Sequence, residues 1–212
     1  MTEYNKITPS IEQKQFINWA KEGKNILVDA CIGSGKTTVA NFFKELGVPV
    51  YIADDAGKEV MESQAILSQI KAVFGEAIFE LGALNRQKLA AIVFSDQEKL
   101  QQLNAIVHPA VANHFKLWLS NHQHFPFIIY ESAILFESKG NEKCNKIITV
   151  TAPLSVKLQR VMARDTATEE QVLLRMKSQW SDDQRVAKSD FVIENIDLEK
   201  TKSQVVKILK IL

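Results

Sequence analysis

Residues 25–43 read NILVDACIGSGKTTVANFF, an apolar stretch that runs through a glycine-containing loop into an amphipathic segment. The apolar residues 25–30 predict a buried strand, and the pattern after Lys36 predicts a helix. The loop between them follows the phosphate-binding pattern G-x-x-x-x-G-K-[ST], with Ala30 at the first glycine position. A strand that passes into a helix through such a loop indicates the nucleotide site of an α/β protein.

This loop supplies the groups that hold phosphate oxygens. Its backbone N–H groups point inward, and the positive end of the following helix adds to the attraction. Lys36 is expected to reach the β- and γ-phosphates of ATP, and the Thr37 hydroxyl is expected to bind Mg²⁺. A chance glycine turn is the alternative, and the strand before and the helix after argue against it. We predict that ATP is bound by Ile32, Gly33, Ser34, Gly35, Lys36, Thr37 and Thr38.

Composition and charge exclude several other classes. The 212 residues suffice for one domain, or for one domain with an inserted subdomain, and for a sizeable core. A net charge of +1 gives no case for a general nucleic-acid-binding surface. Cys31 and Cys144 form no disulfide framework or metal spacing, and no apolar run suggests secretion or a membrane span. We expect a cytoplasmic protein with small-molecule partners, either a monomer or a small homo-oligomer.

Strand-like and helix-like patterns alternate along the chain. Strands are expected at 25–30, 49–53, 125–131, 146–152 and 190–195, and helices at 37–46, 56–74, 86–94, 96–121, 153–164, 168–179 and 197–211. Strands separated by helices imply a parallel sheet with helices on both faces. Only helices are expected between the second and third strands, which predicts a helical subdomain. Residues 1–22 predict a helical extension, with Ser10 as its cap and Gly23 as its stop.

The order of motifs resembles that of dephospho-coenzyme A kinases, which phosphorylate the 3′-hydroxyl of dephospho-CoA. The resemblance covers about residues 25–212 and rests on GSGKTTVANFFKELGVPVYIAD (33–54), LNRQKLAAIVFSD (84–96), LNAIVHPAV (103–111), AILFE (133–137), QRVMARD (159–165) and SDFVIEN (189–195). It implies a P-loop NTPase fold of the nucleoside-monophosphate-kinase type with a five-stranded parallel sheet. It also implies a kinase domain over 23–212, a helical acceptor-binding insertion at about 55–125, a lid at about 154–186, and ATP and Mg²⁺ as cofactors.

Asp54 follows the second strand, at the carboxyl edge where ligands of open α/β sheets bind. The family's aspartate at this place contacts the acceptor hydroxyl, so the resemblance makes Asp54 the candidate catalytic base or orienter. The family usually shows Asp-Ala-Asp, whereas Ile52 replaces the earlier carboxylate here. A helix N-cap is the alternative role for Asp54, and both roles are compatible.

Arg160 and Arg164 are four residues apart and share one face of a helix. In the family, arginines of this region close over the transferring phosphates, a task that suits the guanidinium fork. A solvated charged face is the alternative. Arg164-Asp165 matches the family's RD pair, so Arg164 is the stronger, catalytic candidate, followed by Arg160 for ATP. We expect Lys157 to be solvated.

Further candidates come from the helical insertion and from the third strand. The resemblance gives Arg86 and the His108-Pro109 pair to the acceptor, and structural roles are the alternatives. Glu131 ends the third strand, where P-loop proteins often hold a carboxylate near Mg²⁺; a turn residue is the alternative. For Asn195 and Gln179, structural roles are favoured over contacts with adenine or in the lid.

The N-terminal residues carry a different resemblance. ITPSIEQKQFINWAKEGKNILVDACIGSGKTT (7–38) is similar to the start of a helicase ATPase, with Gln13 or Gln15 in place of its adenine-reading glutamine. A DNA-stimulated ATPase is therefore a second hypothesis, for which Tyr130-Glu131 is the nearest match to an Asp-Glu pair. A third is a nucleotide-binding regulatory module with weakened catalysis. The acceptor on which ATP consumption depends distinguishes the three.

Ala30 and Cys31 stand where the kinase family favours glycine. If either residue had a positive φ, the strain would cost on the order of 1 kcal/mol. Cys31 lies near Lys36 and a helix N-terminus, so its pKa is expected to be lowered, and ATP is expected to protect it from thiol reagents.

Overall fold

The structure is a computed structural model that describes residues 25–133, 136, 144–177 and 179–212. The described chain forms two compact units. The first runs up to Ile52 and resumes from His122 to Leu212, and the second spans Ala53–Asn121. The predicted N-terminal helix, with Ser10, Gln13, Gln15 and Gly23, lies outside the described residues.

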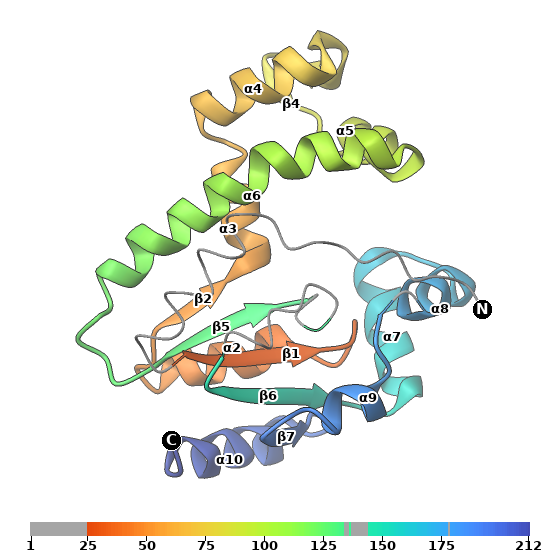
Figure 1. The fold of residues 1–212 in the computed structure, drawn as a ribbon. Helices are drawn as coiled ribbons and strands as arrows, with labels where there is room; N and C mark the ends of the chain where they lie inside the picture. The colour runs from red at the N-terminus through yellow and green to blue at the C-terminus, as the bar shows by residue number, and fades with distance from the viewer. Residues whose placement is uncertain (1–24, 134–135, 137–143, 178) are drawn as a thin grey trace. The chain divides into compact units, whose positions relative to one another are not determined.

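The first unit contains a five-stranded parallel sheet with the strand order β2-β5-β1-β6-β7 (Figure 1). The strands are β1 (Asn25–Ala30), β2 (Val50–Ile52), β5 (Ile128–Ser132), β6 (Lys146–Thr151) and β7 (Phe191–Glu194). Leu27 in the central strand lies opposite Tyr130 on one side and Ile147 on the other. The predicted five-stranded parallel sheet of a P-loop protein is confirmed. β5 begins at Ile128 and not at 125, because Pro126 has no N–H to donate to a neighbouring strand.

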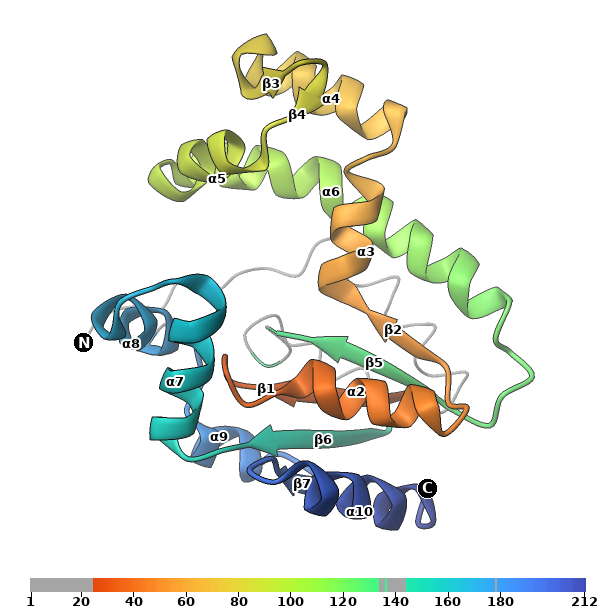
Figure 2. The same cartoon turned by 180° about the vertical axis from the view of Figure 1, so that it is seen from behind.

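Helices cover both faces of this sheet. On one face of the sheet lie α2 (Lys36–Glu45) and α10 (Leu198–Leu209) (Figure 2). Alternate strand residues such as Ile26 and Ile148 form one core cluster with Phe43 of α2 and Val205 of α10. On the other face, Leu27 and Ile147 pack with Phe136, and Trp180 stacks on Phe136 with ring centroids 4.9 Å apart. Trp180 leads into α9 (Asp182–Val186), which contacts β6. The period of two along the strands thus divides the apolar side chains between two cores.

The second unit is mainly helical. It contains α3 (Ala53–Val60), α4 (Gln64–Phe74), a 3₁₀ turn at Glu76–Ile78, α5 (Arg86–Ser95) and α6 (Gln97–Ser120). Its core consists of Ile66, Ile70, Ile78, Leu89 and Val93. Whether this unit binds an acceptor stays a prediction.

The expectation that this region holds only helices is wrong. β3 (Phe79–Glu80) and β4 (Ala83–Leu84) form an antiparallel hairpin around Leu81-Gly82. Both turn residues have positive φ, 50° for Leu81 and 81° for Gly82. A two-residue hairpin turn demands this backbone, but leucine is a rare choice for it, so the usual Asn-Gly signal was missing.

The single helix predicted at 56–74 is two helices. Ser63 has an extended backbone and begins α4 as its N-cap, so the helical hydrogen bonds of α3 cannot continue through it. The helix predicted at 168–179 ends as α8 (Glu169–Lys177). It is separated from α7 (Leu154–Asp165) by Thr166, whose φ is 52°. The short α9 was not predicted, although Ser181 and Gln184 form a capping box at its start.

No helix of the described chain has the length and apolar character needed to cross a membrane.

Candidate functional site

The phosphate-binding loop joins the end of β1 at Ala30 to the start of α2 at Lys36. Gly33 and Gly35 have φ values of 85° and 89°. Among the described non-glycine residues, only Leu81 and Thr166 have positive φ. The strain considered for Ala30 or Cys31 is therefore absent, because the loop makes its left-handed turns at glycines that the sequence retains.

The two glycines also permit close packing. A Cβ atom at Gly33 would lie 2.6 Å from the carbonyl oxygen of Lys157 in α7. A Cβ atom at Gly35 would clash with Nδ2 of Asn195, just after β7. Neither position has room for a side chain, so α7 and the end of β7 lie directly against the loop.

Lys36, Thr37 and Glu131 meet at the carboxyl edge of the sheet. The Lys36 Nζ lies 2.8 Å from Glu131 Oε1, and the Thr37 hydroxyl donates to Glu131 Oε2 at 3.4 Å. The Glu131 side chain is 1% exposed, whereas Lys36 retains 18% exposure. A buried carboxylate beside a hydroxyl offers the hard oxygen donors that Mg²⁺ prefers. The described residues contain no group of three or more His, Cys, Asp or Glu side chains placed to hold a metal.

Gln179 and Asn195, which come from later parts of the chain, form hydrogen bonds to the backbone of the loop. The Ile32 N–H donates to Gln179 Oε1 at 3.0 Å, so this amide is already engaged and is not open to a phosphate. The Asn195 Nδ2 donates to the Ser34 carbonyl oxygen at 2.8 Å in a buried contact. Their partners are far away in the sequence, which is why local patterns did not reveal these contacts.

The expectation that Lys157 is solvated is wrong. Its side chain is 9% exposed, and its Nζ lies 2.9 Å from Asp182 Oδ2. The charged pattern of α7 resembles a solvated face, but α9 supplies a carboxylate that pairs with this lysine. Lys157 therefore connects α7 to the segment that follows α8.

The two arginines of the predicted lid differ in their surroundings. Arg160 Nη1 donates to the Asn195 carbonyl oxygen at 2.9 Å and lies beside Gly35. Arg164 is 65% exposed and forms two hydrogen bonds to Asp165, which also accepts from Arg175 Nη1 at 2.9 Å. The hydrogen bond from Arg164 is the main cause that lowers the pKa of Asp165. Arg160 thus belongs to the surroundings of the loop, while Arg164 lies on the surface in an ion-pair cluster.

The remaining candidates belong to the second unit. Asp54 is exposed and lies in the first turn of α3, which begins at Ala53, so it is not the N-cap. Arg86 Nη2 donates to the Lys58 carbonyl oxygen at 2.9 Å and to Glu62 Oε1 at 2.8 Å. His108 is partly buried within α6, directly before Pro109. The roles of Asp54, Arg86 and His108 toward an acceptor stay predictions.

We expect Cys31 to resist alkylation in the native protein. Burial raises the pKa of its thiol, despite the nearby cations Lys157 and Arg185, and the side chain is nearly inaccessible. This shift is opposite to the one predicted from the sequence, because the effect of burial exceeds that of the nearby cations. Since the thiolate is the reactive form, iodoacetamide at neutral pH should modify the partly exposed Cys144 and leave Cys31 intact.

Mass spectrometry of peptides, with and without ATP, measures this difference, and urea-unfolded protein, in which both cysteines react, is the control. Rapid labelling of Cys31 that ATP prevents would contradict the buried placement.

Comparisons with known proteins agree with one another. A family model described as dephospho-CoA kinase matches residues 26–200. A dephospho-CoA kinase from Bacteroides fragilis is 38% identical over 165 residues, which are 77% of this chain and 80% of that protein. One from Listeria monocytogenes is 37% identical over 196 residues, which are 89% of this chain and 96% of that protein.

Solved structures show the same similarity. TT1252 from Thermus thermophilus superposes with a TM-score of 0.81 at 32% identity, over 89% of this chain and 97% of that one. A dephospho-CoA kinase from Campylobacter jejuni has a TM-score of 0.64 at 24% identity, over 88% of this chain and 95% of that one. The second similarity concerns the fold alone.

Proposed function

This chain belongs to the dephospho-CoA kinase family, and we propose that it transfers the terminal phosphoryl group of ATP to the 3′-hydroxyl of dephospho-CoA, which yields coenzyme A. The observation that carries this proposal is the meeting of Lys36, Thr37 and Glu131 at the end of a glycine loop. Phosphoryl transfer needs little covalent chemistry from the protein, because it depends on positioning and on stabilisation of charge.

The loop and Lys36 act on the nucleotide. Backbone N–H groups from Gly33 to Thr38 bind phosphate oxygens together with the N-terminus of α2. The Lys36 ammonium, which Glu131 holds at 2.8 Å, neutralises charge on the β- and γ-phosphates. Arg160 lies beside the loop, and Arg164 adds a second guanidinium that becomes available when its ion pair with Asp165 opens. A guanidinium binds two phosphate oxygens at once.

Thr37 and Glu131 are the residues that would hold Mg²⁺, by the Thr37 hydroxyl and the Glu131 carboxylate. Bound there, Mg²⁺ neutralises phosphate charge. On the acceptor side, Asp54 orients the 3′-hydroxyl and accepts its proton, and Arg86 and His108 contact other parts of dephospho-CoA. These assignments rest on the match between this sequence and the motifs of the family.

Acceptor dependence tests the function. Release of ADP is measured with dephospho-CoA, with single-stranded DNA and with no acceptor. We expect turnover only with dephospho-CoA. Turnover that depends on DNA would support the helicase hypothesis, and binding of ATP without turnover would support a regulatory module.

We further propose a cytoplasmic protein that acts as a monomer or a small homo-oligomer and binds no nucleic acid. The sequence has two cysteines without the spacing of a disulfide framework and a net charge of +1, which support this proposal.

A further inference from the structure

A short segment after α8 contacts the phosphate-binding loop, the strand β1 that precedes the loop, and the helix α7 that packs against it. Gln179 accepts the Ile32 N–H, Asp182 pairs with Lys157, and Arg185 pairs with Asp29. We call residues 179–185 the loop bracket. None of these contacts uses the backbone N–H groups from Gly33 to Thr38, which are assigned to phosphate under the proposed function.

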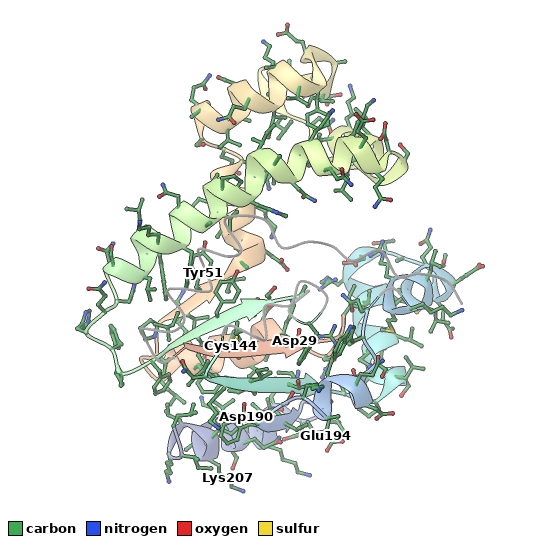
Figure 3. The ribbon with its side chains drawn as sticks, in the orientation of Figure 1. Asp29, Tyr51, Cys144, Asp190, Glu194 and Lys207 are labelled. Carbon is green, nitrogen blue, oxygen red and sulfur yellow. The ribbon has the colours of Figure 1, made fainter. Side chains whose placement is uncertain are left out.

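The bracket is anchored by a buried ion pair. Arg185 and Asp29 are both fully buried, and Arg185 also donates to the Trp180 carbonyl oxygen and lies over the ring of Phe136. Asp29, labelled in Figure 3, is the residue of β1 directly before Ala30. A buried pair with this many contacts holds the bracket at a fixed position relative to the strand from which the loop starts.

A second ion pair joins the bracket to α7, the helix that packs against the loop. Asp182 pairs with Lys157, whose carbonyl oxygen is the atom that a side chain at Gly33 would strike. The same short segment therefore fixes the strand before the loop and the helix that packs on it. Between these anchors, the Ile32 N–H of the loop donates a hydrogen bond to Gln179 Oε1 of the bracket.

We propose that Gln179 is a positioning residue that holds the phosphate-binding loop in its nucleotide-binding conformation through the Ile32 amide. This inference rests on the proposed function, because it presumes that the loop binds ATP. The N–H of Ile32 lies directly before the N–H groups that face phosphate. The hydrogen bond from Ile32 to Gln179 fixes the backbone at this point, so that the N–H groups that follow Ile32 point toward the same phosphate oxygens. Without the Gln179 oxygen as acceptor, the loop also populates other conformations. The apparent affinity for ATP then falls in proportion to the population of the nucleotide-binding conformation.

Gln179→Met tests the role, because methionine has a similar length and lacks the acceptor oxygen. We expect ATP to bind about tenfold more weakly, as measured by calorimetry without acceptor, since one hydrogen bond to a partly buried amide is lost. The matched control is Gln204→Met. Gln204 Oε1 likewise accepts a backbone N–H, that of Glu194 at 3.1 Å, but Gln204 belongs to α10 and this hydrogen bond joins α10 to the end of β7. This control should bind ATP like the wild type and should change the melting temperature about as much as Gln179→Met does.

Hydrogen exchange at the Ile32 amide, followed by NMR in the free protein, supplies a readout that needs no nucleotide. Exchange should accelerate at least about tenfold in Gln179→Met. It should stay slow in Gln179→Glu, which keeps an acceptor oxygen. Arg185 is unsuited to this test, because its loss leaves a buried carboxylate and endangers folding.

Wild-type ATP affinity in Gln179→Met, or equal weakening in the Gln204→Met control, would overturn the positioning role. If the wild-type protein bound ATP but failed to phosphorylate dephospho-CoA, the proposed function would fail while the exchange and binding results still tested Gln179.

Discussion

Replacing Lys36 with alanine is expected to lower phosphoryl transfer from ATP by about a thousandfold, because the lysine ammonium neutralises charge that develops in the transition state. The Lys36 side chain is partly exposed, and its Nζ lies 2.8 Å from Oε1 of the buried Glu131. Water replaces such a cation poorly, since it carries no net charge and is not held in place. Single-turnover kinetics with saturating ATP separate this effect from a change in ATP affinity.

Two further variants make the result for Lys36 decisive. Lys44→Ala changes an exposed lysine in the last turn of the same helix and should leave turnover unchanged. Lys36→Ala combined with Glu131→Gln removes the buried carboxylate together with its cation, and should fold and remain inactive. A folded Lys36→Ala protein with turnover near the wild-type rate would exclude the loop as the site of transfer.

The second large effect is expected for Asp54→Asn, which should lower kcat by about a hundredfold while the affinity for ATP stays near the wild-type value. Asp54 lies two residues beyond the last residue of β2, in the exposed first turn of α3. An asparagine keeps the shape of the side chain but loses the charge that attracts and orients a hydroxyl proton. The rate loss should therefore appear in the step that involves the acceptor.

The neighbouring Asp55 offers a matched control. It shares the first turn of α3 and pairs with Lys58 at 2.7 Å on the surface, so Asp55→Asn removes a comparable charge. We expect Asp55→Asn to keep the wild-type kcat. Equal and small losses in both variants would mean that Asp54 serves the start of the helix through its charge and not the reaction.

Sequence patterns predicted the features that depend on neighbours along the chain. The loop from Ala30 to Thr37 follows from a short motif, and the parallel sheet follows from apolar strands alternating with helices. Where the patterns failed locally, the residues did not carry the usual signal for a turn or a helix end. Leucine in a left-handed turn concealed the hairpin at Leu81, and the absence of glycine or proline concealed the break before Ser63.

The surroundings of the loop depend on contacts that no local pattern reveals. Ile32 and Gln179 are 147 positions apart, and Ser34 and Asn195 are 161 positions apart. Lys157 looked like one of several charges on an exposed helix face, but it is buried against Asp182. Such pairs form only when the folded chain brings distant segments together, so local patterns could not predict the contacts that hold the loop.

The most direct test of the proposed function is the identity of the product. The protein is incubated with ATP, Mg²⁺ and dephospho-CoA, and the acceptor is followed by ³¹P NMR and mass spectrometry. We predict a new phosphate monoester on the ribose 3′-oxygen, formed in equal amount with ADP and absent with the Lys36→Ala variant. Formation of ADP without phosphorylated acceptor, or a phosphate attached elsewhere on dephospho-CoA, would contradict the assignment of this chain as a kinase of the 3′-hydroxyl.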